Sequence, residues 1–520
     1  MKINIIYIFL AVFWGFVSCG NENNNHEIDK CLNITCNSQQ TCKEGVCICD
    51  DNDKKLSSGG LCVCKDDNKI INENGKCVDD NIAPTITEVK TIETNENSFT
   101  SNVSPEFTFS SDEKGILYLS GDCKIENKAN VEIGENTIKF DELYSGLYEN
   151  CEIWVTDKAN NESNHLKLKS FSVFNVERTE TIKGRTDGIG VDYVIIGDGF
   201  KENEQELFKQ KAQEFTDYIL NYDPVLSMQK HLWNIHLINL ISKDSGADNS
   251  NDNNMPKLVN TGLDSYFNCN NIQRLLCINQ SKVNYIVGEM FPQFDKVLII
   301  VNSQTYGGAG GNYATASINP AGKQIAIHEL GHSFAGLADE YEYGRTEVPS
   351  TEPMEPNITI NNDPQTVKWN KWLTEDNVDI FEGGAYVDHG VYRPTEDSLM
   401  RTLGKPFYQV NLEAWTLALY RMVGGYITKT PEDDDLILWG TTDYDFSIEL
   451  SLGTDLQRVE WYVDGIKQED VSDDTTTFRY GKQAVGKYQV KAIIYDKSDI
   501  IRSDPNGNSI TDAVWNVTSE

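Results

Sequence analysis

One short run of residues has the types and spacing that metal-assisted hydrolysis requires, His328-Glu329-Leu330-Gly331-His332. On a helix, residues four positions apart share a face, so His328 and His332 can bind one ion together. A hydrolytic zinc site has three protein ligands and one open position for water. Glu329 lies beside the histidines and can accept a proton from that water. The run therefore predicts a zinc site with Glu329 as the catalytic base.

The third ligand must come from the chain that follows His332. A straight helix would place Asp339 about 10 Å further along its axis, whereas an oxygen ligand lies about 2.0–2.2 Å from zinc. Glycine readily adopts the left-handed conformation that ends a helix, so we expect the chain to turn at Gly336 and return. Asp339 and Glu340 are then the near candidates. We favour Asp339, because a short carboxylate suits a tight turn, and keep Glu340 as the alternative.

Two further features of the sequence bear on this site. Glu352 is a more distant candidate ligand, but Pro349, Pro353 and Pro356 oppose the second helix that it would need. Gly331 costs a helix about 1 kcal/mol relative to alanine. We therefore expect another backbone to pack closely against the helix at Gly331.

The stretch from His328 to Tyr341 resembles the IgA-specific metalloendopeptidases, the igalysin branch of the metzincin zinc peptidases. Other stretches that are similar to this family are Val191 to Phe200, Ser242 to Asp248, Asp295 to Gly311 and Gly390 to Pro394. The resemblance covers about residues 178–428. It implies a metzincin-like domain, zinc as the cofactor and hydrolysis of peptide bonds.

The resemblance also assigns two single residues. Asp339 occupies the final ligand position of the metzincin pattern, displaced by one residue. Met400 matches the methionine of the turn that follows in these enzymes. This sequence departs from the family in having Ser398, and no cysteine, beside that turn. A local disulfide is therefore absent there, and we expect packing to hold the turn.

The N-terminal residues predict export. Residues 1–19 have a positive charge near their start, at Lys2, and continue as an apolar stretch that is too short to span a membrane, as in a signal peptide. The stretch ends in Cys19, in a context that resembles a bacterial lipobox and predicts a lipid on this residue. Cleavage by an ordinary signal peptidase is the alternative. We expect a lipoprotein anchored to a membrane through Cys19, at the bacterial cell surface or outer membrane, or otherwise a secreted protein.

The cysteines are consistent with an oxidising compartment. When Cys19 is set aside, the remaining twelve of the thirteen cysteines fall into even groups. Eight lie within residues 31–80, where they predict a disulfide-rich, EGF-like module. Zinc binding is the rival interpretation of that module, but it lacks a Cys-x2-Cys spacing. The other groups predict that Cys123 pairs with Cys151 and Cys269 with Cys277.

The predicted fold class is multidomain. Residues 20–30 form a polar tether, and residues 84–175 show the short alternating strands of an Ig-like β-sandwich. Residues 178–428 alternate helical patterns with buried strands, such as the apolar runs at 191–196 and 296–301. This alternation indicates an α/β domain, the one that the resemblance makes a metzincin-like zinc peptidase. Residues 436–520 return to strands and predict a second β-sandwich, after an acidic linker at 431–435.

Charge and motif together limit the possible functions. The chain has 80 acidic and 45 basic residues, a formal charge of -35, which repels phosphate backbones and excludes nucleic acid as a partner. We expect a secreted, lipid-anchored zinc endopeptidase that acts on extracellular proteins or peptides, with substrate pairing along a strand near Ala314 to Ile318. The rival is an adhesive surface protein that uses the peptidase-like domain as a scaffold. Glu329 argues against it, because a scaffold needs no base beside two histidines.

Overall fold

The computed structural model describes residues 40–43, 46–49, 54–57, 61–65, 69–71, 76–125, 129–185, 188–249, 258–438, 443–481 and 484–520. The predicted signal peptide, the lipid site at Cys19 and the tether at 20–30 lie outside these residues. The described residues form two compact units, one of those up to residue 93 with 104–141 and 148–170, and one of those within 94–103, 142–147 and 171–520. No helix in the described parts of the chain is long and apolar enough to cross a membrane.

The first unit is made of short antiparallel strands. Its N-terminal part contains three hairpins, β1 (Gln40–Lys43) with β2 (Val46–Cys49), β3 (Lys54–Leu56) with β4 (Cys62–Cys64), and β5 (Lys69–Ile71) with β6 (Cys77–Asp79). A disulfide joins Cys64 to Cys77. Most of the other cysteines of the predicted EGF-like module lie where the structure describes no side chain.

The rest of the first unit contains two sheets. One has the order β12 (Gly134–Lys139), β9 (Glu106–Ser111), β7 (Ile86–Lys90), and the other β11 (Asn130–Val131), β10 (Gly115–Ser120), β14 (Glu152–Thr156), β15 (Leu166–Lys167). Alternate residues such as Phe107 and Phe109, or Ile153 and Val155, are buried, as the period of two in the sequence predicts. Cys123 and Cys151 form the predicted disulfide.

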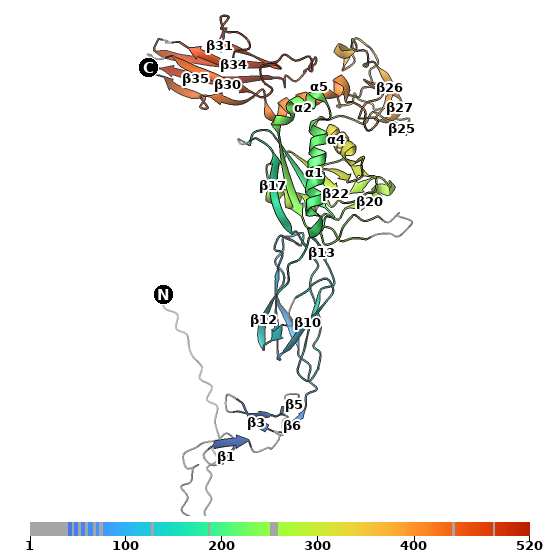
Figure 1. The fold of residues 1–520 in the computed structure, drawn as a ribbon, viewed down its shortest axis with the longest axis vertical. Coiled ribbons are helices and arrows are strands. Elements are labelled where there is room, and N and C mark those ends of the chain that lie inside the picture. The colour runs from blue at the N-terminus through green and yellow to red at the C-terminus, as the bar shows by residue number, and fades with distance from the viewer. Residues whose placement is uncertain are drawn as a thin grey trace, which may run out of the picture. The chain divides into compact units, whose positions relative to one another are not determined.

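The second unit is built on a six-stranded sheet (Figure 1). In spatial order the strands are β17 (Val176–Lys183), β19 (Trp233–Leu240), β18 (Val191–Asp198), β22 (Lys296–Val301), β24 (Ala314–Ser317) and β23 (Gly308–Ala309). The central strands are parallel, and β17 and β23 are antiparallel to their neighbours. Parallel strands buried on both faces appear in a sequence as continuous apolar runs. The two runs identified in the sequence are β18 and β22.

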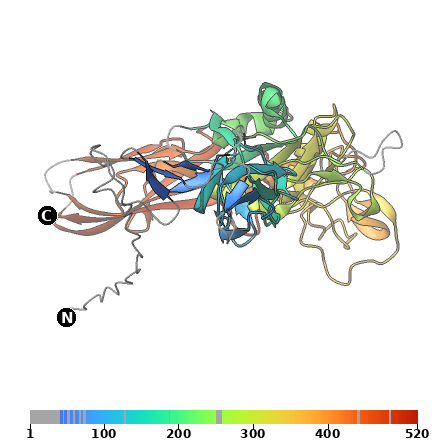
Figure 2. The same cartoon turned by 90° about the horizontal axis from the view of Figure 1, so that it is seen from below.

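Helices cover both faces of this sheet. Tyr193 and Ile195 of β18 belong to a core shared with α1 (Gln205–Leu220), α4 (Gly322–Ser333) and α5 (Tyr408–Val423). Val194 and Ile196, which point the other way, pack with α3 (Gln280–Met290). Figure 2 shows α1, drawn green, along its axis. The layers form the α/β domain that the sequence predicts, with α4 carrying the histidine motif.

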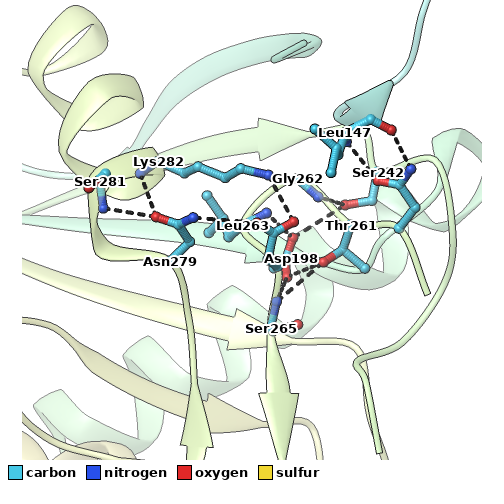
Figure 3. A network of polar contacts seen from close by, with 12 residues as sticks. Leu147, Asp198, Ser242, Thr261, Gly262, Leu263, Ser265, Asn279, Ser281 and Lys282 are labelled. Atoms are coloured by element: carbon cyan, nitrogen blue, oxygen red, sulfur yellow. Dashed lines mark hydrogen bonds and ion pairs between the residues drawn. The ribbon is translucent and has the colours of Figure 1, made fainter. Parts of the chain in front are cut away.

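A buried carboxylate anchors a long connection of this domain (Figure 3). Asp198 ends β18 and is fully buried. It accepts hydrogen bonds from the Thr261 hydroxyl at 2.8 Å and from the backbone amides of Leu263 at 2.9 Å and Ser265 at 3.2 Å. The connection continues to Cys269 and Cys277, which form the predicted disulfide. Burial raises the pKa of Asp198, while the surrounding donors oppose that rise.

The C-terminal residues form two sheets that share one core. The sheets are β28 (Tyr426–Thr430), β30 (Tyr444–Leu450), β33 (Thr477–Tyr480), and β29 (Asp435–Leu438), β35 (Ile510–Ser519), β34 (Gly486–Asp496), β31 (Gln457–Val463), β32 (Ile466–Lys467). Phe446, Trp461 and Trp515 lie in their common core. The strands begin before the predicted boundary at residue 436. The predicted linker at 431–435 lies between β28 and β29 and includes Asp435, the first residue of β29. One short strand directly after a helix shows too little alternation to be recognised in the sequence.

Candidate active site

The histidine motif lies on α4, as its spacing predicts. Ile327 and Leu330 of this helix are buried in the core beneath the sheet, which leaves His328, Glu329 and His332 on the side of the cleft. Gly331 faces the segment that carries Met400, and a Cβ atom at this glycine would lie 2.8 Å from Met400 Sδ. The close packing expected at this glycine is therefore present. The neighbours are the side chains of Met400 and Phe407, so the expectation of a backbone at this position was wrong.

Three side-chain atoms converge above the helix. His328 Nε2 lies 3.1 Å from His332 Nε2, and Asp339 Oδ1 lies 3.1 Å from the first nitrogen and 3.3 Å from the second. Each Nδ1 atom faces a backbone carbonyl oxygen, of Leu399 for His328 and of Leu337 for His332. A carbonyl only accepts, so the Nδ1 atoms carry protons. When the imidazoles are neutral, their Nε2 lone pairs point at one another.

This donor set fits a zinc ion. Two lone pairs and a carboxylate oxygen repel one another unless a cation lies between them. Zinc bound at about 2.0–2.2 Å in a tetrahedral arrangement holds its ligands about 3.3–3.6 Å apart, close to the 3.1–3.3 Å separations of these atoms. The Nδ1 contacts to Leu399 and Leu337 are the outer hydrogen bonds that orient metal-binding imidazoles.

The chain returns to the histidines through the turn that the sequence predicts. α4 ends at Ser333, and Gly336 adopts the left-handed conformation, with φ of 69°. The turn is closed by hydrogen bonds from the Gly336 amide to the His332 carbonyl and from the Leu337 amide to the Gly331 carbonyl, both at 3.1 Å. The turn brings the Asp339 carboxylate back over the helix and so makes it the third member of the cluster.

Glu340 faces away from the cluster, into the protein. It is fully buried and accepts hydrogen bonds from the side chains of Ser398 at 2.8 Å, Asn357 at 3.0 Å and Asn411 at 3.0 Å. Its amide donates to the Met400 carbonyl at 2.9 Å. The alternative of Glu340 as a ligand is therefore not supported by its position. The methionine turn is held by the packing that the sequence predicts, since Leu399 and Met400 are buried, and also by these polar contacts.

Charge interactions within the cluster are strong. Burial opposes protonation of His332, but the hydrogen bond and charge of Asp339 outweigh it and raise the pKa of His332 to about 9. Burial alone would raise the pKa of Asp339, and the two histidines reverse this and lower it. Burial raises the pKa of Glu329. Without a cation, His332 therefore holds a proton on Nε2, next to Asp339. A cation bound by the three side chains would take the place of that proton.

The cluster lies in a cleft of about 1230 Å³. Gly308 to Gly311 form one part of its rim, and a Cβ atom on Gly310 would lie 2.1 Å from Glu329 Oε2. The glycine run therefore lets the backbone approach the predicted base. The expectation that substrate pairs with the strand near Ala314 to Ile318 was wrong, because β24 is paired with β22 on one side and β23 on the other.

Tyr386 is a site residue that the sequence did not reveal. Its hydroxyl donates a short hydrogen bond to Asp339 Oδ2. Tyr386 follows β26 (Phe381–Gly384) and begins β27 (Tyr386–Arg393), which forms a small sheet with β25 (Glu342–Arg345). Ala385 and Tyr386 both have positive φ, 49° and 69°, which costs about 1–2 kcal/mol for each residue. The pair Gly383-Gly384 was the only signal of this turn.

Comparison with known proteins agrees with this geometry. Residues 182–378 match the family model described as IgA Peptidase M64. This region of the chain belongs to the IgA peptidase M64 family. The M64 match confirms the resemblance inferred from the sequence and makes the domain a metallopeptidase. It contains the histidine motif and Asp339, whereas Tyr386 and Met400 follow it in the chain.

Two other comparisons do not extend the M64 assignment. No curated protein matches the chain. One solved structure, the crystal structure of FMN-binding beta-glucuronidase from Facaelibacterium prausnitzii L2-6, is 10% identical over 84% of this chain and 74% of that one, with a TM-score of 0.12. A likeness with so low a TM-score carries no argument about fold or function.

Proposed function

We propose that this M64 peptidase is a zinc-dependent endopeptidase with Glu329 as its general base and His328, His332 and Asp339 as the metal ligands. The observation that carries the proposal is the convergence of three ligand atoms beside Glu329 in one cleft. When bound, zinc supplies Lewis acidity that activates water and polarises a carbonyl group.

The residues of the chain then have distinct tasks. The Glu329 carboxylate accepts a proton from the attacking water and later donates it to the leaving amine. Its raised pKa, caused by burial, suits a group that must hold the proton between these two steps. The Nδ1 contacts and the Tyr386 hydroxyl orient the ligand atoms before substrate binds.

The experiment is hydrolysis of a protein mixture by the full chain, with cleavage sites identified by mass spectrometry. We expect cleavage to stop with a chelator and to return with zinc. Glu329→Gln should keep zinc and lose several orders of magnitude in rate, because base and activated water act as one unit. Glu355→Gln, at another glutamate of the same cleft, is the matched control and should keep its activity.

The two outcomes of this experiment separate the proposal from its rival. Cleavage within substrate chains supports an endopeptidase. An exported chain that binds zinc but hydrolyses no peptide bond would show the adhesive scaffold instead.

We also propose that the chain is exported, and that it is anchored through a lipid on Cys19. The apolar N-terminal stretch and the disulfides Cys123–Cys151 and Cys269–Cys277 support export to an oxidising compartment. The strand regions that precede residue 178 would serve as EGF-like and Ig-like spacers between the membrane and the peptidase. Intact mass of the exported chain tests this, since a lipid adduct at an N-terminal Cys19 is expected, and a mature end beyond Cys19 would contradict the anchor.

A further inference from the structure

One side of the cleft is formed by arginine and tyrosine side chains. We call Arg274, Tyr341, Tyr343, Arg345 and Tyr386 the Arg–Tyr wall; all five line the cleft. The wall starts at the metal cluster, because the Tyr386 hydroxyl donates to Asp339. The tyrosine rings contact one another, with centroid distances of 5.1 Å, 5.3 Å and 6.1 Å. The wall is thus continuous with the predicted catalytic centre.

The two arginines of the wall contact tyrosines, and Arg274 also lies near enough to Glu329 to lower the pKa of that carboxyl. Arg274 Nη2 donates to the Tyr343 hydroxyl at 2.8 Å, and Arg345 Cζ lies 4.8 Å from the centroid of the Tyr386 ring. Within the described part of the chain neither guanidinium forms an ion pair. A third arginine of the cleft, Arg401, is paired with Glu342 at 2.9 Å. Acidic residues outnumber basic ones by 80 to 45, so two unpaired arginines beside one cleft are a distinctive feature.

Arg274 is also placed on a fixed backbone. It lies within the loop that the Cys269–Cys277 disulfide closes. Its carbonyl accepts a hydrogen bond from the Gly308 amide of β23 at 3.1 Å. A guanidinium has five donors in a fork that matches a carboxylate, and the contacts to Tyr343 and Tyr341 use only part of them. The remaining donors are available to a ligand in the cleft.

We infer that the Arg–Tyr wall is a subsite for an aspartate or glutamate side chain of the substrate, next to the scissile bond. The inference rests on the proposed peptidase function. An extended substrate advances about 3.3 Å per residue, so a residue adjacent to the bond at the metal reaches the wall that begins at Tyr386. Its carboxylate binds Arg274 in a charge-assisted pair, with Arg345 beside it. The arginines also attract acidic peptides to a cleft in a protein that otherwise repels them.

The test uses short peptides with blocked ends that are identical except for Glu, Gln or Lys at each position beside the cleaved bond. We expect kcat/KM of the full chain to be about ten- to a hundredfold higher for Glu than for Gln, as for hydrogen bonds to charged groups. Arg274→Gln should remove most of this preference, and Arg274→Glu should shift it toward Lys. Arg479→Gln, on a strand of the C-terminal sheets, is the control and should leave the preference unchanged.

Binding separates failure of the inference from failure of the peptidase proposal. Affinities of the same peptides for the zinc-loaded Glu329→Gln chain, with and without Arg274→Gln, report on the wall without hydrolysis. Equal affinity for Glu and Gln peptides, or a preference that survives replacement of both arginines, overturns the inference even if peptides are cleaved. A preference that appears only with a free C-terminal carboxylate also overturns it. Absence of cleavage, with the expected binding preference, overturns the peptidase proposal alone.

Discussion

The Ser398 hydroxyl donates a 2.8 Å hydrogen bond to Glu340 Oε2, and this contact joins the segment that carries Asp339 to the turn that carries Met400. Ser398 also accepts a hydrogen bond from the Met400 amide at 3.0 Å. Glu340 and Ser398 therefore fix the segment that follows α4 relative to the turn at Met400, which packs against the helix of the two histidines. The consequence is that Asp339 and its neighbour have separate roles that substitutions can distinguish.

Replacement of Asp339 and Glu340 should affect different properties. Asp339→Asn removes charge from the cluster, and we expect zinc to be lost at much lower chelator concentrations than from the wild type. Glu340→Gln places an amide donor against other donors, so it should keep zinc but lower the free energy of unfolding by about 1–3 kcal/mol. Metal content after dialysis and urea unfolding measure the two effects. Zinc loss from Glu340→Gln alone would show that the wrong carboxylate was chosen.

Gly331→Ala should destabilise the protein despite its better helix propensity. Alanine gains about 1 kcal/mol in a helix, but its Cβ would lie 2.8 Å from the buried Met400 Sδ. Overpacking of this kind typically costs about 1–3 kcal/mol. Gly288→Ala in α3, where a Cβ meets nothing within 4 Å, is the matched control and should stabilise slightly. Thermal unfolding compares the two, and equal stabilisation would refute the packing argument.

Tyr386→Phe should weaken metal binding without removing the ring from the cleft. The variant loses the hydroxyl that donates to Asp339 Oδ2, and loss of such an outer partner typically lowers metal affinity by about 10–100-fold. Tyr343→Phe loses only the contact to Arg274 and should bind zinc as the wild type does. Competition with a chromogenic chelator gives both affinities. Wild-type affinity in Tyr386→Phe would leave the strained turn at this residue without a functional explanation.

Asp198→Asn should lower stability and change its dependence on pH. The new amide NH2 group is a donor, and it would lie against the hydroxyl and backbone amides that donate to Asp198 in the wild type. This mismatch should lower the free energy of unfolding by about 1–3 kcal/mol. Burial raises the pKa of Asp198 in the folded protein above its ordinary value of 3.8, which applies to the unfolded chain. At pH values between 3.8 and the raised pKa, the folded state therefore binds the proton more tightly than the unfolded state. The wild-type free energy of unfolding should therefore fall as pH rises through this window. The slope should be smaller in Asp198→Asn, and identical slopes would contradict the assignment.

The sequence by itself determined the elements whose signal is local. The four-residue spacing of His328 and His332 sets both on one helix face, because the period of an α-helix is fixed by backbone geometry. Continuous apolar runs identified β18 and β22, since strands buried on both faces have no polar side to show. The even cysteine groups anticipated the pairs Cys123–Cys151 and Cys269–Cys277.

Only the tertiary structure decided which side chains meet at the site. Asp339 and Glu340 are adjacent and chemically alike, and their roles differ because the turn at Gly336 points one to the histidines and the other to Ser398. Tyr386 and Arg274 reach the cleft from segments distant in sequence, through contacts that leave no local pattern. β24 is internal to the sheet because β23 folds back beside it. Strand order and chain return arise from burial summed over the whole domain, which no short window of sequence records.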